Sequence, residues 1–517
     1  MTVQFLTAEE AAAHVRDGAT VALAANGGGM LEPTAVIAAV ERRFLDGASP
    51  RDLTLVHALG VGDRGSRGVN GFAHEGMVRK VIGGHWTWSA SMMQLAAEEK
   101  IAAYVMPAGV ITHLYRESGA RRPGYITRTG LHTFADPRLK GCRANGAATE
   151  ELVEVLELDG EEFLRYKPLQ VDVAIVRGTE VDDQGNIGAD AEPAILDALE
   201  AAQAARGNGG VVIVQVKRRV ERIDPRRVFL PGALVDYVVV VPEQTQTYVC
   251  EEDPALFAPV APASLEGPAG ITDPIRAVVA RRAAMEVGAG DVLNLGFGMS
   301  ADVGKVLREE GRLGTVQLAV EQGLYNGVPE LGDLFGMATG PSARVSSAVQ
   351  FDIFAGGLID VTCLGMAQTD RHGNVNVSAF GGKVMGPGGF VDISQNARTA
   401  VFCGSFTAKG LRVHLEDGRL VIDQEGQVAK FVPEVEEVTY AGPYAAAQGR
   451  RALYVTERCV FQLTADGLEL IEVAPGIDIE RDILAHLDFR PLVRAVAPMP
   501  AACFAPLATT DQLAPVA

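Results

Sequence analysis

The chain has 517 residues, of which 48% are hydrophobic and 21% are charged, and its formal net charge at pH 7 is −19. A chain of this length exceeds one ordinary hydrophobic core, so its length predicts two or more folded domains. Its high content of hydrophobic residues argues against disorder. The negative charge argues against a surface that binds nucleic acid or an anionic membrane, because phosphate binding depends on clustered Lys and Arg.

No apolar run approaches the length that spans a bilayer, and the first twelve residues carry acids where a signal peptide would carry basic and then apolar residues. These features predict a cytoplasmic protein. The six cysteines are scattered without CxxC spacing, and the nine histidines form no HExxH motif. The sequence therefore gives no reason to expect a metal, a disulfide framework or a permanently bound cofactor.

The chain opens with a capping box, in which Thr7 is followed three residues later by Glu10. The segments that follow predict an Ala-rich helix, a buried strand, a glycine loop and a second helix, at residues 8–18, 21–23, 26–30 and 33–44. Elements in this order are typical of a parallel α/β unit.

The same order of elements returns 272 residues later. At this spacing Ala8, Ala11, Ala12, Val15, Gly18 and Leu23 correspond to Ala280, Ala283, Ala284, Val287, Gly290 and Leu295. A second echo lies 188 residues apart, where the strands leading to Asp182 and Asp370 each run into a Gly-Asn turn. Two echoes in the same order predict duplicated α/β halves.

The duplication divides the chain. We expect an N-terminal domain at residues 1–251 and a C-terminal domain at residues 271–497. The stretch between them, residues 252–270, is rich in Pro and Ala and predicts a linker. Residues 498–517 predict a loosely held tail.

The carboxyl ends of the predicted strands are the places to look for chemistry, because ligands collect there in parallel α/β sheets. The apolar strand 315–320 ends at Glu321, a candidate catalytic carboxylate, although a glutamate that ends a strand is more often a solvated residue. The run 380–390 has five glycines in eleven positions. Such density lets backbone approach a ligand closely.

Residues 296–301 offer a different interpretation, because Gly-Phe-Gly-Met-Ser-Ala after a strand satisfies the GxGxxA form of a dinucleotide fingerprint. Glu321 lies 20 residues after Ala301, where such a fingerprint places the carboxylate that binds ribose hydroxyls. The chain would then be a NAD-dependent oxidoreductase. The glycine loop of the first half has no such fingerprint, but the residues alone leave both interpretations open.

Together these motifs resemble class I CoA-transferases, especially the single-chain type that acts on acetate, propionate or 3-oxoacids. The segments that carry the resemblance include Asn294-Leu295-Gly296-Phe297-Gly298, Glu321-Gln322-Gly323, Gln350-Phe351-Asp352 and Gly388-Gly389-Phe390-Val391-Asp392-Ile393, with Gly28-Gly29, Gly109-Val110-Ile111 and Asp136-Pro137-Arg138 in the first half. The resemblance implies an α/β fold of two related open domains of the NagB/RpiA-like type, with the alpha and beta halves of the family fused in one chain.

The resemblance also implies roles for single residues. Glu321 falls on the glutamate that forms a glutamyl-CoA thioester. The residues implied for CoA binding are Asn294, Gly296, Gly298, Gly388 and Gly389. Gly28 and Gly29 fall on the loop that closes the acyl side and supplies oxyanion donors. The residues implied near the site are Gln322, Gly323, Ala108 and Tyr325. Among these, Gln322 replaces the usual Ser and Ala108 the usual Gln, and Tyr325 is bulkier than expected, which leaves the acyl group open.

The activity implied is ping-pong transfer of CoA from a short-chain acyl-CoA to a free carboxylic acid, in short-chain fatty acid or ketone body metabolism. Coenzyme A is then a substrate, no metal is needed, and the partners are acyl-CoA and short-chain carboxylates. The resemblance further suggests a homodimer or homotetramer. An acyl-CoA hydrolase on the same fold and a non-catalytic CoA-binding protein remain alternatives.

Overall fold

Two sheets of mainly parallel strands organise the chain in the computed structural model, which describes residues 3–260 and 270–507. The first sheet has the strand order β1-β15-β12-β9-β2-β3-β4-β5. Its strands are β1 (Gln4–Phe5), β2 (Thr20–Leu23), β3 (Leu53–His57), β4 (Val78–Gly83), β5 (Ala102–Val105), β9 (Val173–Arg177), β12 (Val211–Val216) and β15 (Tyr237–Val240).

The second sheet has the strand order β21-β18-β17-β16-β22-β27-β33-β34-β35-β36. Its strands are β16 (Val292–Leu295), β17 (Gln317–Val320), β18 (Leu324–Tyr325), β21 (Ala343–Arg344), β22 (Val361–Gly365), β27 (Thr399–Cys403), β33 (Arg451–Val455), β34 (Cys459–Thr464), β35 (Gly467–Val473) and β36 (Leu492–Pro498). The run from β17 through β16, β22 and β27 to β33 is parallel, so its carboxyl ends share one edge.

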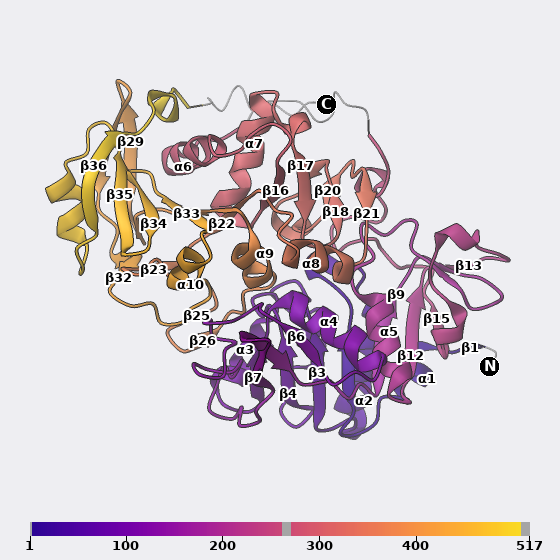
Figure 1. Cartoon of the computed structure of the whole chain (residues 1–517). Helices are drawn as coiled ribbons and strands as arrows, with labels where there is room; N and C mark the ends of the chain where they lie inside the picture. The colour runs from indigo at the N-terminus through magenta and orange to yellow at the C-terminus, as the bar shows by residue number, and fades with distance from the viewer. Residues whose placement is uncertain (1–2, 261–269, 508–517) are drawn as a thin grey trace.

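Helices cover both sheets, and three of them meet between the halves (Figure 1). They are α1 (Ala8–Ala12), α2 (Thr34–Gly47), α3 (Ala90–Ala97), α4 (Ala108–Gly119), α5 (Ala198–Gly207), α6 (Pro274–Ala284), α7 (Asp302–Glu309), α8 (Ser347–Ala355), α9 (Phe390–Asn396) and α10 (Gly442–Ala447). Helices α8 and α9 of the second half lie against α4 of the first. No helix among residues 3–260 and 270–507 is long and apolar enough to cross a membrane.

The two halves repeat the same hydrogen bonds at the spacing that the sequence predicts. The backbone amide of Thr20 donates to Asp172 Oδ2 at 2.8 Å, and the amide of Val292 donates to Asp360 Oδ2 at 2.9 Å. These pairs join β2 to β9 in the first half and β16 to β22 in the second, so an aspartate before the second strand of each pair fixes the start of the first.

A second repeated device is an aspartate turn. Asp182 Oδ1 accepts from the amides two and four residues later, both at 2.9 Å, and Asp370 Oδ1 accepts from the equivalent amides at 2.9 and 3.0 Å. The side-chain amides of Asn186 and Asn374 close the two turns on the same aspartates. The structure therefore confirms an α/β fold of two related halves.

The segments outside the two sheets follow the predictions only in part. Within the predicted linker, Leu256 is buried and the Ala255 carbonyl accepts from the Gly340 amide at 2.7 Å, while residues 261–269 lie outside the described residues. The loosely held tail is wrong for residues 498–507, because Cys503 and Phe504 are buried and Arg281 donates to three carbonyls of that segment. Residues 508–517 lie outside the described residues. The domain limits remain a prediction.

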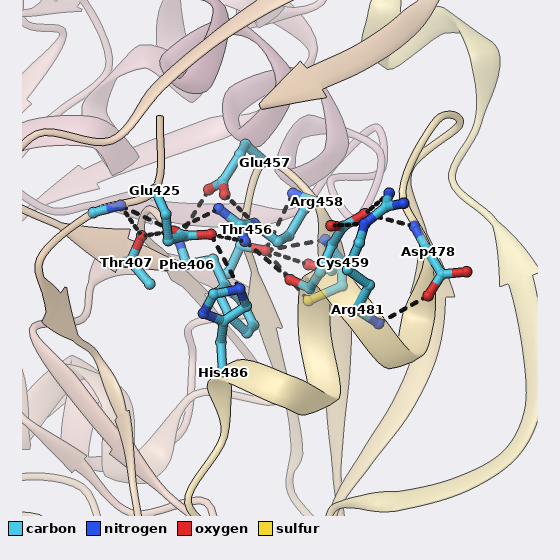
Figure 2. Close-up of polar contacts among 12 residues, drawn as sticks. Phe406, Thr407, Glu425, Thr456, Glu457, Arg458, Cys459, Asp478, Arg481 and His486 are labelled. Carbon is cyan, nitrogen blue, oxygen red and sulfur yellow. Dashed lines mark hydrogen bonds and ion pairs between the residues drawn. The ribbon is translucent and has the colours of Figure 1, made fainter. Parts of the chain in front are cut away.

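A buried arginine stabilises the far end of the second half (Figure 2). The Arg458 side chain is fully buried, and its guanidinium donates to Glu457 Oε1 and Glu425 Oε2, both at 2.8 Å. It also donates to the Asp482 carbonyl at 2.9 Å and lies over the ring of Phe406. Glu457 is fully buried as well. Removing the arginine would leave this carboxylate without its hydrogen-bonded cation, although the charge of Lys430 also acts on it.

We therefore expect Arg458→Met to lower the free energy of unfolding by about 3–5 kcal/mol, the range seen when one partner of a buried ion pair is removed. Arg494→Met is the matched control, because Arg494 is 58% exposed and its ion pairs should contribute less than about 1 kcal/mol. Urea denaturation followed by circular dichroism measures both. Equal losses in the two variants would contradict a structural role for the Arg458 cluster.

Candidate active site

Glu321 stands at the carboxyl end of β17, where the chain turns into β18. The turn requires glycine at position 323, whose φ is +88° and where a Cβ atom would lie 2.2 Å from the Val345 carbonyl oxygen. The Gly323 amide donates to the Val320 carbonyl at 3.0 Å and closes the turn. This geometry places the glutamate side chain at the edge of the sheet rather than within it.

The strand end that carries Glu321 is held by side-chain amides. Asn294 Nδ2 donates to the Ala319 carbonyl at 2.9 Å, and Gln350 Nε2 donates to the Val320 carbonyl at 3.0 Å. Asn294 Oδ1 accepts from the Thr362 hydroxyl at 3.1 Å, which ties β17, β16 and β22 together. Asn294 was implied as a CoA-binding residue. It borders the cavity, but its polar atoms are engaged in fixing the strands.

The Glu321 carboxylate accepts two hydrogen bonds. Gln322 Nε2 donates to its Oε1 at 3.2 Å, and the backbone amide of Gly389 donates to it as well. Burial raises the pKa of Glu321 to about 7, and these two donors work against that rise. The side chain is partly exposed to the cavity. At neutral pH a substantial fraction of Glu321 is therefore a weakly solvated anion, which suits a nucleophile.

The glycine loop beside Glu321 is fixed by the first half of the chain. The Gly388 amide donates to the Gly84 carbonyl at 2.8 Å, and the Gly388 carbonyl accepts from the Ala108 amide at 3.0 Å. A Cβ atom at Gly389 would lie 2.6 Å from Glu321 Oε2. Ala108 is fully buried and is not among the residues that border the cavity. It contacts the glycine loop through its hydrogen bond to Gly388. Gly388 borders the cavity, but its amide and its carbonyl are both engaged with the first half.

A cavity of about 220 Å³ opens between the two halves over Glu321. The second half contributes the ends of β16, β17 and β22 and the loop before α9. Phe297, with 54% of its surface exposed, borders the cavity and contacts Phe335 edge-on at 5.1 Å between ring centroids. Gln322 borders the cavity and reaches Asn26 at 3.5 Å. Tyr325 follows in β18 and is not among the bordering residues.

The predicted acyl-side glycines are placed differently from expectation. The Gly28 amide donates to the Gly62 carbonyl at 3.0 Å, and a Cβ atom at Gly28 would lie 1.8 Å from the Asp333 carbonyl oxygen. Gly29 packs against the ring of Tyr248. Both glycines are buried and neither borders the cavity. Their conformational freedom serves close packing between the halves, and this structure does not offer the Gly28 amide to an oxyanion.

The two glycines of the other implied loop, Gly296 and Gly298, differ in whether they border the cavity. Gly296 borders the cavity, but its amide donates to the Cys363 carbonyl at 2.8 Å. The Gly298 carbonyl accepts from Arg276 at 3.1 Å, and this residue does not border the cavity. The fingerprint segment forms a 3₁₀ turn, Gly298–Ala301, before α7. The Glu321 carboxylate is in direct contact with Gly389 rather than with the fingerprint segment, an arrangement that does not support the ribose-binding interpretation.

Sequence reasoning missed the wall that the first half contributes. His85, Thr87 and Trp88 follow β4, and Arg64 follows β3, so all four come from carboxyl ends of strands. The Arg64 guanidinium lies over the Trp88 ring at 3.9 Å. Gly27 and Gly60 make the slot for that ring, since a Cβ atom at either would lie within 2.4 Å of it. The strand-end rule could have indicated these loops, although no local motif marks them.

The fold and the position of the site together define the class: a two-half α/β protein with a carboxylate in the cavity between its halves. Residues 5–241 match the family described as coenzyme A transferase. Over 500 residues, covering 95% of this chain and 93% of the relative, the chain is 41% identical to acetate CoA-transferase YdiF of Escherichia coli K12. It is 42% identical over 504 residues to caffeate CoA-transferase of Acetobacterium woodii, covering 95% of each.

A solved structure of a CoA-transferase is also similar to this chain. The acyl-CoA transferase YdiF of E. coli O157:H7, in a thioester complex with CoA, superposes with a TM-score of 0.92 at 39% identity, covering 97% of this chain and 96% of that chain. The chain belongs to the coenzyme A transferase family and is a CoA-transferase. The resemblance, the fold class and the enzyme class predicted from the sequence are thereby confirmed.

Proposed function

We propose that this CoA-transferase works by a ping-pong mechanism through a thioester between coenzyme A and Glu321. The observation that carries the proposal is the Glu321 carboxylate itself, which faces the cavity between the halves and accepts from the Gly389 amide. A carboxylate suits this chemistry because it can act first as a nucleophile and then as an activated acyl group.

The covalent steps balance without a net proton. The Glu321 carboxylate attacks the carbonyl of the acyl-CoA, and the C–S bond breaks to release CoA thiolate and leave an acyl-glutamyl anhydride. The thiolate then attacks the glutamyl carbonyl, which forms the glutamyl-CoA thioester and releases the donor acid. An acceptor carboxylate attacks that thioester, and the same two steps run in reverse.

The oxyanion at the glutamyl carbonyl needs a fixed donor, and the Gly389 amide is suited to supply it. In this proposal Gly389 takes the role that the family resemblance implied for Gly28 and Gly29. The exposed ring of Phe297 at the cavity border is suited to contact the pantetheine arm of CoA. Trp88 and Arg64 of the first half would contact the acyl group, and Gln322 would orient the nucleophile.

Intact mass of the protein after mixing with acetyl-CoA tests the proposal. A CoA-sized adduct is expected, and borohydride should remove it and leave a reduced residue that peptide mapping places at position 321. Release of product only when a carboxylic acid is present would distinguish the transferase from a hydrolase. No adduct with the CoA thioester of acetate, propionate, butyrate, acetoacetate or caffeate, in a protein that still turns over, would argue against the covalent route.

The pH dependence of adduct formation gives a second test. Because the anion is the nucleophile and the pKa of Glu321 is raised to about 7, the rate should rise about tenfold per pH unit below pH 7 and stop rising near it. Stopped-flow mixing with acetyl-CoA from pH 5 to 8 measures this rising limb of the pH–rate profile. A limb centred near 4.5, the ordinary value for glutamate, would contradict a desolvated nucleophile.

The acids to try follow from the relatives and from the cavity. The names of the relatives point to acetate and caffeate. Aromatic side chains from both halves, Trp88 and Phe390 among them, border the cavity and can pack against either. We propose acetate, propionate, butyrate, acetoacetate and caffeate as the first panel of acceptors. We also expect a homodimer or homotetramer, which light scattering after gel filtration would establish.

A further inference from the structure

A second carboxyl group lies buried next to the site that we have described. Asp392 belongs to the first turn of α9, three residues after Gly389, and only 5% of its surface is exposed. Its Oδ2 accepts from the Gly109 amide at 3.2 Å, at the N-terminal end of α4. A Cβ atom at Gly109 would lie 2.5 Å from Asp392 Oδ1. The two halves therefore meet at this carboxyl group with no space between them.

The contact between Asp392 and Gly109 is connected to the nucleophile through one ring. Phe351 packs against Gly109 on one side and Gly389 on the other, since a Cβ atom at either glycine would lie 3.0 Å or less from the ring. The next residue along α4, Ala108, is hydrogen-bonded to the Gly388 carbonyl. A displacement of α4 at Asp392 would thus reach the amide that donates to Glu321.

Among residues 3–260 and 270–507, no cation acts on the Asp392 carboxyl group as an electrostatic partner. The ionisable groups whose charge acts on it directly are Glu321, from the end of β17, and Tyr125 and Tyr166, from β6 (Tyr125–Thr127) and β8 (Glu161–Tyr166). Further along α4, His113 lies 2.8 Å from Asp352 of α8, and Asp352 in turn holds Arg116 at 2.9 Å. The His113 and Arg116 side chains of α4 thus contact Asp352.

Burial raises the pKa of Asp392 to about 8, and the negative charge of Glu321 adds to the rise. The charge of the Glu321 carboxylate thus favours the protonated form of Asp392, whereas the Gly109 amide favours its anion. Because Glu321 faces the cavity and Asp392 does not, the geometry leaves the charge on Glu321.

We propose that Asp392 is a positioning residue that must be protonated for transfer: its carboxyl group holds the N-terminus of α4 against the Gly388–Gly389 loop, and its proton leaves Glu321 as the only negative charge of the pair. Each tetrahedral intermediate places a negative charge on an oxygen at the glutamyl carbonyl or beside it. An ionised Asp392 would repel that charge, although the Gly109 amide itself binds the ionised carboxylate more strongly than the neutral acid. This inference rests on the proposed mechanism.

The test is the pH profile of adduct formation with acetyl-CoA, extended to pH 10, in the wild type and in Asp392→Asn. The wild-type rate is expected to fall about tenfold per pH unit above pH 8. Asparagine keeps an acceptor for the Gly109 amide and cannot ionise, so the variant should react within about tenfold of the wild type at pH 7 and lose the falling limb. Tyr125→Phe, which removes another ionisable neighbour, should keep that limb.

A falling limb that persists unchanged in Asp392→Asn would overturn the proposal, as would a wild-type rate that stays level up to pH 10. If Asp392→Asn fails to fold, Asp392→Ala takes its place; it must also lose the limb, but with a lower rate at pH 7 because the Gly109 amide then has no acceptor. Adduct formation in the wild type at pH 7 is measured first. Its absence would count against the proposed mechanism, and a normal adduct with an unaltered limb would count only against Asp392.

Discussion

Glu321→Gln is expected to lower the rate of CoA transfer by at least about 10⁴-fold and to abolish the CoA adduct, because loss of a covalent nucleophile removes the reaction path rather than one contact on it. Glutamine has nearly the shape of glutamate but only one acceptor oxygen, so one of the two donors, Gly389 and Gln322, keeps its partner and the fold should survive. Transfer from acetyl-CoA to propionate, together with the melting temperature, measures both consequences.

Glu330→Gln is the matched control, since this carboxylate lies nine residues further on and bonds the Thr339 hydroxyl outside the cavity. It should leave transfer within about twofold of the wild type. Glu321→Asp is a separate diagnostic: the shorter side chain retracts from the cavity, so we expect loss of transfer with some thioester hydrolysis retained. Substantial transfer by Glu321→Gln would mean that another group carries CoA.

The duplication shows which parts of the fold a single sequence reveals. Asp182 and Asp370 could be paired from the sequence because each turn uses one aspartate and one asparagine at fixed local spacing, and the structure shows the same hydrogen bonds in both. Local capping at Thr7 and Glu10 was equally predictable. The tail was not, because burial of Cys503 depends on its contact with α6, which is more than 200 residues away in the sequence.

The candidate site likewise contains residues that the local sequence could predict and residues that it could not. Glu321 could be located because a polar residue ends an apolar strand, a local pattern that the strand-end rule converts into a candidate. The placement of Gly28 could not, because a glycine that lets a ligand approach and a glycine that lets another loop approach have the same sequence. Asp392 lay within a motif that the family resemblance indicated, yet its partner Gly109 is 283 residues away and gives no local signal.

The contacts around Gly389 explain why a loop rich in glycine can be a rigid part of the site. Gly388 is hydrogen-bonded through both its amide and its carbonyl to the first half, and Trp86 donates to the Met385 carbonyl at 2.8 Å. The loop that carries the proposed oxyanion donor is therefore positioned by the other half of the chain. Under the proposed mechanism, the geometry around Glu321 depends on how the two halves meet.

Gly389→Ala is the sharpest test of that dependence, and we expect it to lower the rate of adduct formation by about 10²–10³-fold, the effect of losing one oxyanion donor. The backbone at Gly389, with φ −83° and ψ 6°, is accessible to alanine, so the substitution carries no conformational penalty of its own. The added methyl group would lie 2.6 Å from Glu321 Oε2 and 3.0 Å from Phe351, and it must displace one of them.

Gly314→Ala controls for a methyl group added at a glycine of the same half, because nothing lies within 4 Å of a Cβ atom there and β17 begins three residues later. It should react at the wild-type rate. In Gly389→Ala the loss should fall on adduct formation with the melting temperature within a few degrees of the wild type, since the strain is concentrated on one carboxylate. A normal rate in Gly389→Ala would show that the carboxylate can move away from this amide without cost, and the oxyanion donor would then have to be sought among the cavity residues of the first half.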